Sequence, residues 1–296
     1  MRSCPSCRPR TSAAVREEGV DRARQTYAVG EHRVAREVEL RTLGSDFGAN
    51  GYATLAEVSE LAGTLGLRSG RWLLDVGSGQ GWPGLYLARQ TGCQVVLTDV
   101  PVEGLATATR RVTREGLDSR AWALAARGQM LPLRPGAFDA AIHTDVLCCL
   151  RPKLATLRAT FLALRHGGRT AFTAIFPTTG LTAAENRRAV EAGPPECGLR
   201  TSYPSLLRSA GFVEIEERDL TADYHATASR KLEVAEQFAG DMIEMLGRQE
   251  YELLQADRRL AISAIEAGLL RRSLFVARRP TPRGRARSEE VIQEVC

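Results

Sequence analysis

A glycine-rich turn between an apolar segment and a helical segment is the clearest chemical feature of the sequence. Residues 73–84 read Leu-Leu-Asp-Val-Gly-Ser-Gly-Gln-Gly-Trp-Pro-Gly, and a helical pattern follows over Leu85–Gln90. Glycines at such a turn allow positive φ angles and let a ligand approach the backbone without obstruction from a Cβ atom. The helix that begins there presents unpaired N–H groups, which attract a carboxylate or a phosphate. The turn therefore predicts a nucleotide-binding site.

An acidic residue closes the next apolar segment. Asp99 follows Gln94–Thr98, and in open α/β folds an acid at this point reaches ribose hydroxyls at the carboxyl edge of the sheet. Gly79–Gly84 also matches the dinucleotide pattern G-x-G-x-x-G, which is weak by itself. Asp75, inside the end of the preceding strand, favours a cationic ligand over a pyrophosphate. Two classes of nucleotide cofactor therefore compete for this site.

Strand-like and helical patterns alternate along most of the chain. Short apolar runs suited to buried strands are separated by helix-length segments, which is typical of βαβ units and a largely parallel sheet. The segment Thr221–Leu270 is too long for a simple crossover and predicts two helices, around Ser229–Leu246 and Glu250–Ala267. The predicted strands are Trp72–Val76, Gln94–Thr98, Ala121–Ala125, Phe138–His143, Thr170–Phe176, Phe212–Arg218 and Ser273–Ala277. The predicted fold is α/β: a Rossmann-like, seven-stranded, mostly parallel sheet with helices on both faces and a helical insertion before the last strand.

The remaining segments divide the chain into one domain and two tails. Residues 1–20 and 280–296 are rich in Arg and contain Pro, and we expect both to be disordered. Residues 21–279 would form the domain. Within it, the charged stretch from residue 20 to residue 43 predicts a helix on the surface, Gly44–Gly51 a loop, and the apolar spacing from Leu55 to Leu65 a further helix.

The glycine turn resembles the first motif of class I methyltransferases that use S-adenosylmethionine (SAM), whose usual form is hydrophobic-(Asp/Glu)-x-Gly-x-Gly-x-Gly. Several later segments resemble further motifs of that family in the correct order, so the resemblance covers about residues 50–176. It is closest to the small-molecule group that includes ubiquinone- and glycine-type methyltransferases. The matching segments are Leu73–Gly81, Asp99, Leu131–Asp139, Thr144–Leu150 and Leu164–Arg169.

The resemblance implies how SAM would be held. The Gly77–Gly81 backbone would pack against the methionine part, Asp75 would lie near its amino group, and Asp99 would hold the ribose. Residues 128–130 would lie near the adenine, although Arg127 stands where the family often has an acid and has no acceptor for the adenine amino group. The cofactor-binding residues expected in this way are Asp75, Gly77, Ser78, Gly79, Gly81, Asp99, Gln129, Met130, Thr144 and Tyr52.

Four side chains are candidates for proton transfer or for covering the acceptor. His143 and Asp145 end the fourth strand, where a histidine could accept a proton from the acceptor or could simply hydrogen-bond the local backbone. Tyr224 and His225 open the insertion and could form a lid pair, or Tyr224 could pack while His225 is solvated. Tyr52 could close over SAM or pack as a core aromatic. Alignment alone can supply much of the rate of methyl transfer, so no base is required.

Composition and charge narrow the class of partner. With 44% hydrophobic and 25% charged residues the chain is ordinary globular, and no run approaches eighteen consecutive apolar residues, so no membrane partner is predicted. The net charge of +5 lies in residues 1–10 and 278–296, so the body between them is close to neutral, which disfavours nucleic acid as a partner. Thr144–Leu147 also lacks the Asn/Asp-Pro-Pro-aromatic pattern of amino-group nucleic-acid methylases.

The cysteines and the N-terminal residues predict a cytoplasmic protein. The seven cysteines are an odd number, and the adjacent Cys148 and Cys149 cannot easily share a disulfide. Cys4 and Cys7 have half of a zinc-knuckle spacing, but no second pair follows, so no metal site is predicted. No apolar stretch follows the basic residues near Met1, which argues against a secretory signal.

The function that these features predict is methyl transfer from SAM to an oxygen or nitrogen of a small molecule, by in-line displacement. Residues 221–270 would form a helical substrate lid, and residues 177–205 would also shape the acceptor pocket. Two alternatives stay open. One is a SAM-binding regulatory protein without transfer activity, and the other is an NAD(P)-dependent oxidoreductase.

Overall fold

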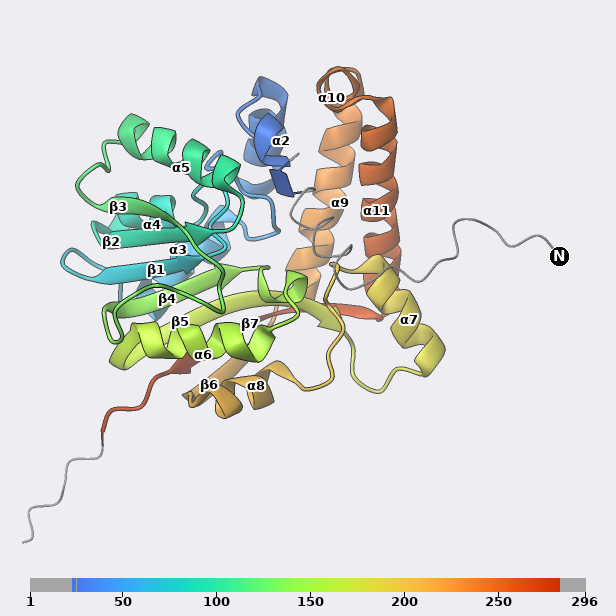
Figure 1. Cartoon of the computed structure of the whole chain (residues 1–296). Coiled ribbons are helices and arrows are strands. Elements are labelled where there is room, and N and C mark those ends of the chain that lie inside the picture. Colours follow the sequence, from blue (N-terminus) through green and yellow to red (C-terminus); the bar gives the residue numbers. More distant parts are fainter. Residues whose placement is uncertain (1–22, 25, 283–296) are drawn as a thin grey trace, which may run out of the picture.

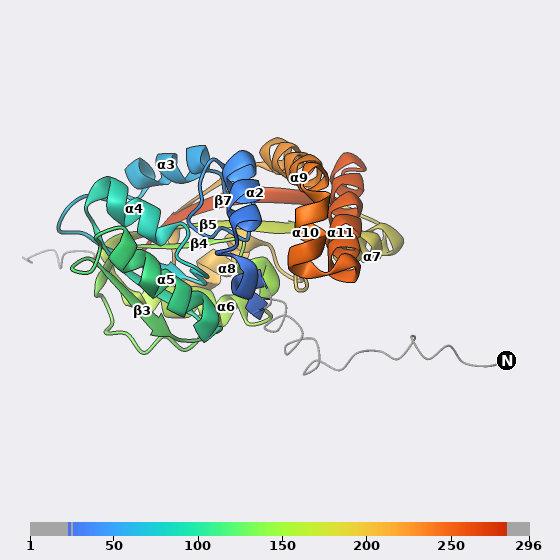
Figure 2. The same ribbon diagram turned by 90° about the horizontal axis from the view of Figure 1, so that it is seen from above.

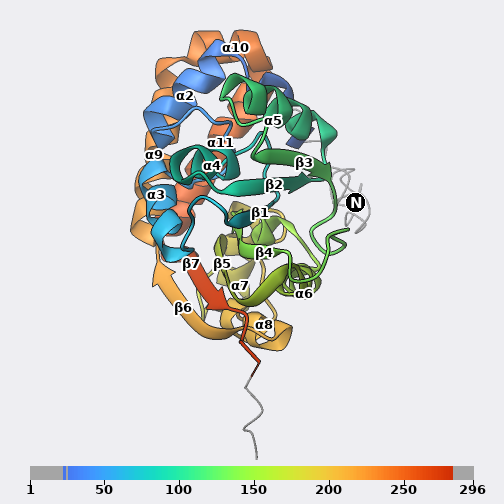
Figure 3. The ribbon, with the colours of Figure 1, turned by 90° about the vertical axis from the view of Figure 1, so that its left-hand side faces the viewer.

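A computed structural model describes residues 23–24 and 26–282 (Figure 1). Its centre is a seven-stranded sheet in the order β3-β2-β1-β4-β5-β7-β6, which can be followed strand by strand down Figure 3. Strands β1 to β5 pair in parallel, and β7 is antiparallel to both β5 and β6. The predicted class and all seven predicted strands are confirmed. The strands are β1 (Trp72–Val76), β2 (Gln94–Asp99), β3 (Ala121–Ala125), β4 (Phe138–Thr144), β5 (Leu164–Pro177), β6 (Val213–Asp219) and β7 (Leu270–Arg278).

Helices cover both faces of the sheet because side chains alternate between the faces along each strand. Leu73 of β1 packs into a core with α3, α4 and α5, while its neighbour Leu74 packs into a second core with α6 and α8. Both leucines are fully buried. The helices of these two layers are α3 (Leu55–Thr64), α4 (Gly84–Thr91), α5 (Val102–Arg114), α6 (Lys153–Ala163) and α8 (Tyr203–Ala210).

The insertion before the last strand forms three helices, so the prediction of two was wrong in number. They are α9 (Thr221–Gln237), α10 (Ala239–Leu246) and α11 (Arg248–Glu266). The helical path breaks at Phe238, whose φ and ψ of −105° and 23° leave helical values, and again at Gly247, whose φ is 82°. Figures 1 and 2 show the three helices standing together beyond one end of the sheet, beside α2, with α7 (Ala183–Ala192) near their base.

Helix α2 (Arg33–Leu43) packs on its inner side against this insertion, so the prediction of a surface helix was only partly correct. Val34 and Val38 are buried in a small core with Val234 of α9 and Met242 of α10. Glu39 is also buried, and its carboxylate accepts hydrogen bonds from the N–H groups of Gly48 and Ala49 at 2.9 and 3.0 Å. Helix α2 therefore holds the loop that follows it.

Glu39→Gln is expected to remove a pH dependence of stability. Burial raises the pKa of Glu39 to about 7, although the N–H of Ala49 acts to lower it. Because this pKa lies above the ordinary 4.5, the stabilisation by the bound proton is complete below about pH 4.5 and is lost as pH rises through about 7. From pH 4.5 to 8 the wild-type free energy of unfolding should fall by on the order of 3 kcal/mol relative to Glu39→Gln.

Urea unfolding at pH 4.5, 6.5 and 8 measures this difference. Glu37→Gln is the matched control, because Glu37 lies on the same helix and pairs at its surface with Arg41 at 2.6 Å. We expect the control to keep the wild-type pH dependence. The same pH dependence in wild type and Glu39→Gln would contradict the assignment.

In the part of the chain that the structure describes, no helix is both long and apolar enough to span a bilayer. The segment predicted as a disordered N-terminus, with Cys4 and Cys7, lies outside the described residues, as does most of the predicted tail. Residues 279–282 follow β7 without regular secondary structure.

Candidate functional site

The glycine turn after β1 has a shape that only glycine permits at two of its positions. Gly77 and Gly81 have φ of 74° and 111°, in the left-handed region. A Cβ atom on Gly77 would lie 2.6 Å from Val146, and one on Gly81 would lie 2.4 Å from Leu85. The turn is thus packed closely between the loop after β4 and the start of α4. We call the backbone of Gly77–Gly81 the cradle.

Asp99 and the glycine turn meet at the carboxyl edge of the sheet. Strands β1 and β2 are paired up to Val76 and Thr98, so the residues that follow them lie side by side. The Asp99 Oδ2 atom accepts a hydrogen bond from the Gly79 N–H at 2.7 Å, and Oδ1 accepts one from the Val100 N–H at 2.6 Å. Burial raises the pKa of Asp99, and these N–H groups act to lower it. The carboxylate is therefore held rigidly beside the cradle.

Asp75 lies under the cradle and fixes its far end. Its carboxylate is buried, and Oδ2 accepts a hydrogen bond from the N–H of Gly84 at the start of α4, at 2.9 Å. Oδ1 is buried and has no hydrogen-bond partner among the described residues. Burial raises the pKa of Asp75 well above its ordinary value. Asp75 thus caps α4, and its second oxygen fits the role of acceptor for a cationic group.

The residues expected near the adenine lie in the loop between β3 and β4. A Cβ atom on Gly128 would lie 3.2 Å from Val76, so this glycine is next to the end of β1. Gln129 and Met130 instead line a cavity of about 330 Å³ against α6, and Met130 is largely exposed. Gly128 thus lies beside the end of β1, whereas Gln129 and Met130 line the cavity at α6.

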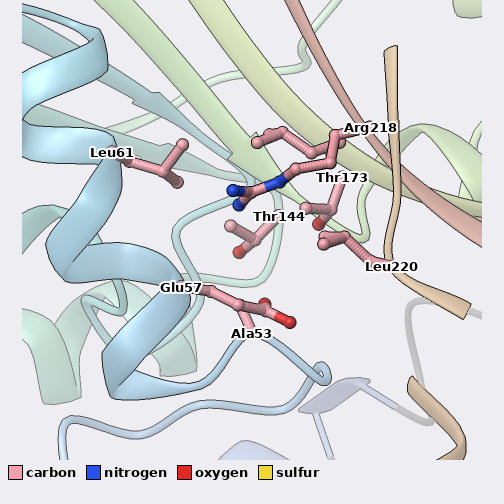
Figure 4. A pocket seen from close by; sticks show the side chains of 8 residues that line it. Ala53, Glu57, Leu61, Thr144, Thr173, Arg218 and Leu220 are labelled. Atoms are coloured by element: carbon pink, nitrogen blue, oxygen red, sulfur yellow. The ribbon is translucent and has the colours of Figure 1, made fainter. Parts of the chain in front are cut away.

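Thr144 and Asp145, at the end of β4, belong to a buried polar cluster. Thr144 faces a cavity of about 10 Å³ that Thr173 and Glu57 also line, and Figure 4 shows these side chains converging from β4, β5 and α3. Asp145 has a φ of 55°, which is strained for a residue with a Cβ atom. Arg272 of β7 is fully buried and donates to both Asp145 and Glu57 at 2.9 Å.

Asp145 accepts hydrogen bonds from three donors and is a poor proton acceptor. Its Oδ1 accepts from the Thr173 hydroxyl at 2.9 Å as well as from Arg272, and its Oδ2 accepts from the Tyr52 N–H at 2.9 Å. Burial acts to raise the pKa of Asp145, but the Arg272 guanidinium and the other donors outweigh it and leave the pKa below its ordinary value. The carboxylate instead ties the Tyr52 loop to the end of β4.

His143 points into the apolar core, which contradicts its candidate role as a base for the acceptor. Successive side chains point to opposite faces of a strand, and Thr144 takes the face toward α3. His143 is fully buried on the other face, stacked on Phe172 with ring centroids 4.7 Å apart. Neither ring nitrogen has a partner among the described residues, so the alternative of a backbone hydrogen bond is also not found. Burial lowers the pKa of His143 to about 3, and the ring stays neutral.

Tyr224 and His225, adjacent in sequence, have different environments. Tyr224 is buried, and its ring meets that of Tyr52 edge to face at 4.6 Å. His225 lies on the surface and pairs with Glu266 of α11 at 3.1 Å. Of the two alternatives, the structure shows the one in which Tyr224 packs and His225 lies at the surface, and no lid pair forms. Tyr224 joins the Tyr52 loop near Asp145.

Three side chains at the site carry no signal in the sequence. Tyr27 reaches Asp99, and Arg272 reaches Asp145 across 127 positions of the chain. The Lys231 ammonium of α9 donates to the Gly51 carbonyl oxygen at 2.6 Å and lies 5.0 Å over the Tyr52 ring. Burial lowers the pKa of Lys231 to about 7. Each of these contacts joins distant segments, so no local pattern could have predicted it.

Comparisons with known proteins match this chain to methyltransferases. A family profile described as a methyltransferase domain matches residues 74–172. The chain is 30% identical over 192 residues to 27-O-demethylrifamycin SV methyltransferase of Amycolatopsis mediterranei (strain S699), covering 64% of this chain and 70% of that protein. It is 31% identical over 171 residues to methyltransferase GfsG of Streptomyces halstedii, covering 55% of this chain and 60% of the relative.

The fold also matches a solved methyltransferase structure. Phosphoethanolamine N-methyltransferase 2 of Haemonchus contortus, in complex with phosphomonomethylethanolamine and S-adenosylhomocysteine, superposes with a TM-score of 0.74 at 19% identity. The match covers 90% of this chain and 60% of that one, so the chain spans about three fifths of the length of this structure and of GfsG. Sequence motif, sheet order and relatives agree, and the chain belongs to the class I SAM-dependent methyltransferases.

Proposed function

We propose that this protein transfers a methyl group from SAM to an oxygen or nitrogen of a small-molecule acceptor. The observation that carries the proposal is the cradle itself. The glycine turn, the Asp99 carboxylate and the unpaired oxygen of Asp75 lie together at the carboxyl edge of the sheet. The related methyltransferases, which act on a rifamycin and on phosphoethanolamine, support a small-molecule acceptor.

The chain's own residues would hold and orient the reactants. The backbone of Gly77–Gly81 would pack against the methionine part of SAM, Asp75 Oδ1 would accept from its ammonium, and Asp99 would accept from the ribose. Bound SAM supplies an electrophilic methyl group on a sulfonium. Since alignment of the acceptor lone pair with that methyl group can provide much of the rate, the protein's main task is to position the acceptor and exclude water.

The acceptor pocket would lie under the lid of residues 221–270, with residues 177–205 along its side. Support comes from Tyr224 of α9, which packs on Tyr52, and from Lys231 of the same helix, which holds the Gly51 carbonyl. These contacts place α9 against the loop that Asp145 ties to the end of β4. An opening between α9 and this loop would expose the end of β4, where the acceptor must approach.

A cytoplasmic site of action and an acceptor other than nucleic acid complete the proposal. The thiols of Cys93, Cys148 and Cys197 are not in disulfides, as a reducing compartment requires. The excess positive charge lies in the terminal segments rather than on a face of the domain. A nicotinamide-dependent oxidoreductase has no support, because the matched relatives are methyltransferases.

The direct test is release of S-adenosylhomocysteine, measured by mass spectrometry, when the protein is given SAM and a panel of hydroxyl and amine acceptors. We expect stoichiometric SAM binding and turnover with at least one acceptor class. A second candidate function is SAM-dependent regulation, because an acceptor that must lose a proton finds no free base in His143, which stacks on Phe172, or in Asp145, which Arg272 binds. SAM binding without release of S-adenosylhomocysteine across the whole panel would support that candidate instead.

A further inference from the structure

Tyr27, outside the family motifs, lies in the cradle. Residues 26–29 are helical, and the side chain of Tyr27 is 9% exposed. Its hydroxyl donates to Asp99 Oδ2 at 3.2 Å, on the same oxygen that accepts from the Gly79 N–H. The Tyr27 phenol thus hydrogen-bonds the Asp99 carboxylate, which the family motif assigns to the cofactor ribose.

The tyrosine ring is held in place from several sides. A Cβ atom on Gly104 of α5 would lie 2.9 Å from the ring, and one on Gly79 would lie 3.0 Å from the hydroxyl. The side-chain amide of Gln80, within the glycine turn, donates to the Tyr27 carbonyl oxygen at 2.8 Å. The ring therefore fills the space between the glycine turn and α5, and the turn itself anchors the segment that carries it.

The Tyr27 hydroxyl and a ribose would compete for the same acceptor atoms. A carboxylate offers about four lone-pair sites, of which Val100, Gly79 and Tyr27 already use three. A ribose brings two hydroxyl donors and needs two acceptor sites. Release of Tyr27 frees the second site and also the space between Gly79 and Gly104.

We propose that Tyr27 is an internal mimic of the cofactor ribose, which holds Asp99 until SAM binds and must leave for the ribose to bind. This inference rests on the proposed function, because it takes Asp99 as the ribose ligand. Only the fraction of molecules in which Tyr27 has left Asp99 can bind the ribose. The apparent affinity for SAM is therefore the intrinsic affinity multiplied by that fraction. Tyr27 thus lowers the affinity for SAM and for S-adenosylhomocysteine and slows their association.

Tyr27→Phe tests the proposal, because it deletes the hydroxyl and keeps the ring. A hydrogen bond to a carboxylate is strong enough that its loss should tighten binding of S-adenosylhomocysteine about tenfold in titration calorimetry. Tyr86→Phe is the matched control, since the Tyr86 hydroxyl bonds Ser59 at 2.9 Å, outside the cradle. We expect the control to bind as the wild type does.

Hydrogen exchange on the wild-type protein gives a second reading that needs no variant. If the ribose displaces Tyr27, S-adenosylhomocysteine should speed the exchange of the amides of residues 26–31. Faster exchange together with tighter binding by Tyr27→Phe supports the proposal. Unchanged or weaker binding by Tyr27→Phe, or protection of these amides, overturns it. Absence of any binding of S-adenosylhomocysteine to the wild type would instead overturn the proposed function, so the two failures are distinguishable.

Discussion

Asp99→Ala is expected to weaken SAM binding at least about 100-fold, since two hydrogen bonds from the ribose to a carboxylate contribute about 1.5–3 kcal/mol each. The carboxylate is also what orients the cradle. It accepts from the Gly79 N–H at 2.7 Å and from the Val100 N–H at 2.6 Å, so its loss frees the glycine turn as well. Release of Tyr27 in this variant would favour binding about tenfold, which is smaller than the loss.

Titration calorimetry with SAM measures this effect, and circular dichroism checks that the variant is folded. Asp118→Ala is the control, because Asp118 lies on the surface after α5, where it accepts a hydrogen bond from the Thr113 hydroxyl at 2.8 Å. It should bind SAM with wild-type affinity. Asp99→Asn keeps the shape and removes the charge, and it should also lose most of the affinity. Wild-type affinity in both Asp99 variants would show that the ribose assignment is wrong.

Arg272→Met is expected to destabilise the fold by about 3–5 kcal/mol, because it leaves two buried carboxylates without their cation. Arg272 is fully buried and joins Asp145 of the β4 end to Glu57 of α3. The substitution should also loosen the Tyr52 loop at the site, because Asp145 accepts a hydrogen bond from the Tyr52 N–H at 2.9 Å. Urea unfolding at pH 7.5 measures the loss.

The adjacent Arg271 provides a matched control. It lies on the same strand but pairs near the surface with Asp219 at 2.9 Å, and exposed pairs contribute about 0–1 kcal/mol. Arg271→Met should therefore unfold within about 1 kcal/mol of the wild type. A loss in Arg272→Met no larger than in Arg271→Met would contradict the role of the buried cluster.

The loss of stability caused by Arg272→Met should become smaller as pH falls. In the wild type the pKa of Asp145 is below its ordinary 3.8, so the stabilisation that this carboxylate provides is present above that pH and is lost as pH falls further. Without the guanidinium, burial is opposed only by the remaining hydrogen-bond donors, such as the Tyr52 N–H, and we expect the pKa values of both carboxylates to rise. The variant then gains protons as pH falls, and its deficit should be smaller at pH 4.5 than at pH 7.5. A deficit that grows between pH 7.5 and 4.5 would exclude this explanation.

The positions of the strands and of the glycine turn could be read from the sequence because their signals are local. Trp72–Val76 and Ala121–Ala125 match β1 and β3 to the residue, since apolar runs bounded by turn residues mark buried strands. The glycine spacing and the acid after the next strand also needed no long-range information. A parallel sheet brings the carboxyl ends of β1 and β2 to one edge whatever the rest of the chain does.

The sequence alone thus determined the fold class, the glycine turn and the methyl donor. These features follow from local patterns, because a strand, a turn and a helix in direct succession can be arranged in few ways. Only the tertiary structure decided which side chains share a buried space. In the tertiary structure His143 points into the apolar core and Tyr27 hydrogen-bonds Asp99. Arg272 pairs with both Asp145 and Glu57. These contacts cross up to 215 positions of chain, and they depend on packing and on the desolvation of charges. Neither side-chain packing between distant segments nor the desolvation of charges leaves a periodic pattern along the sequence.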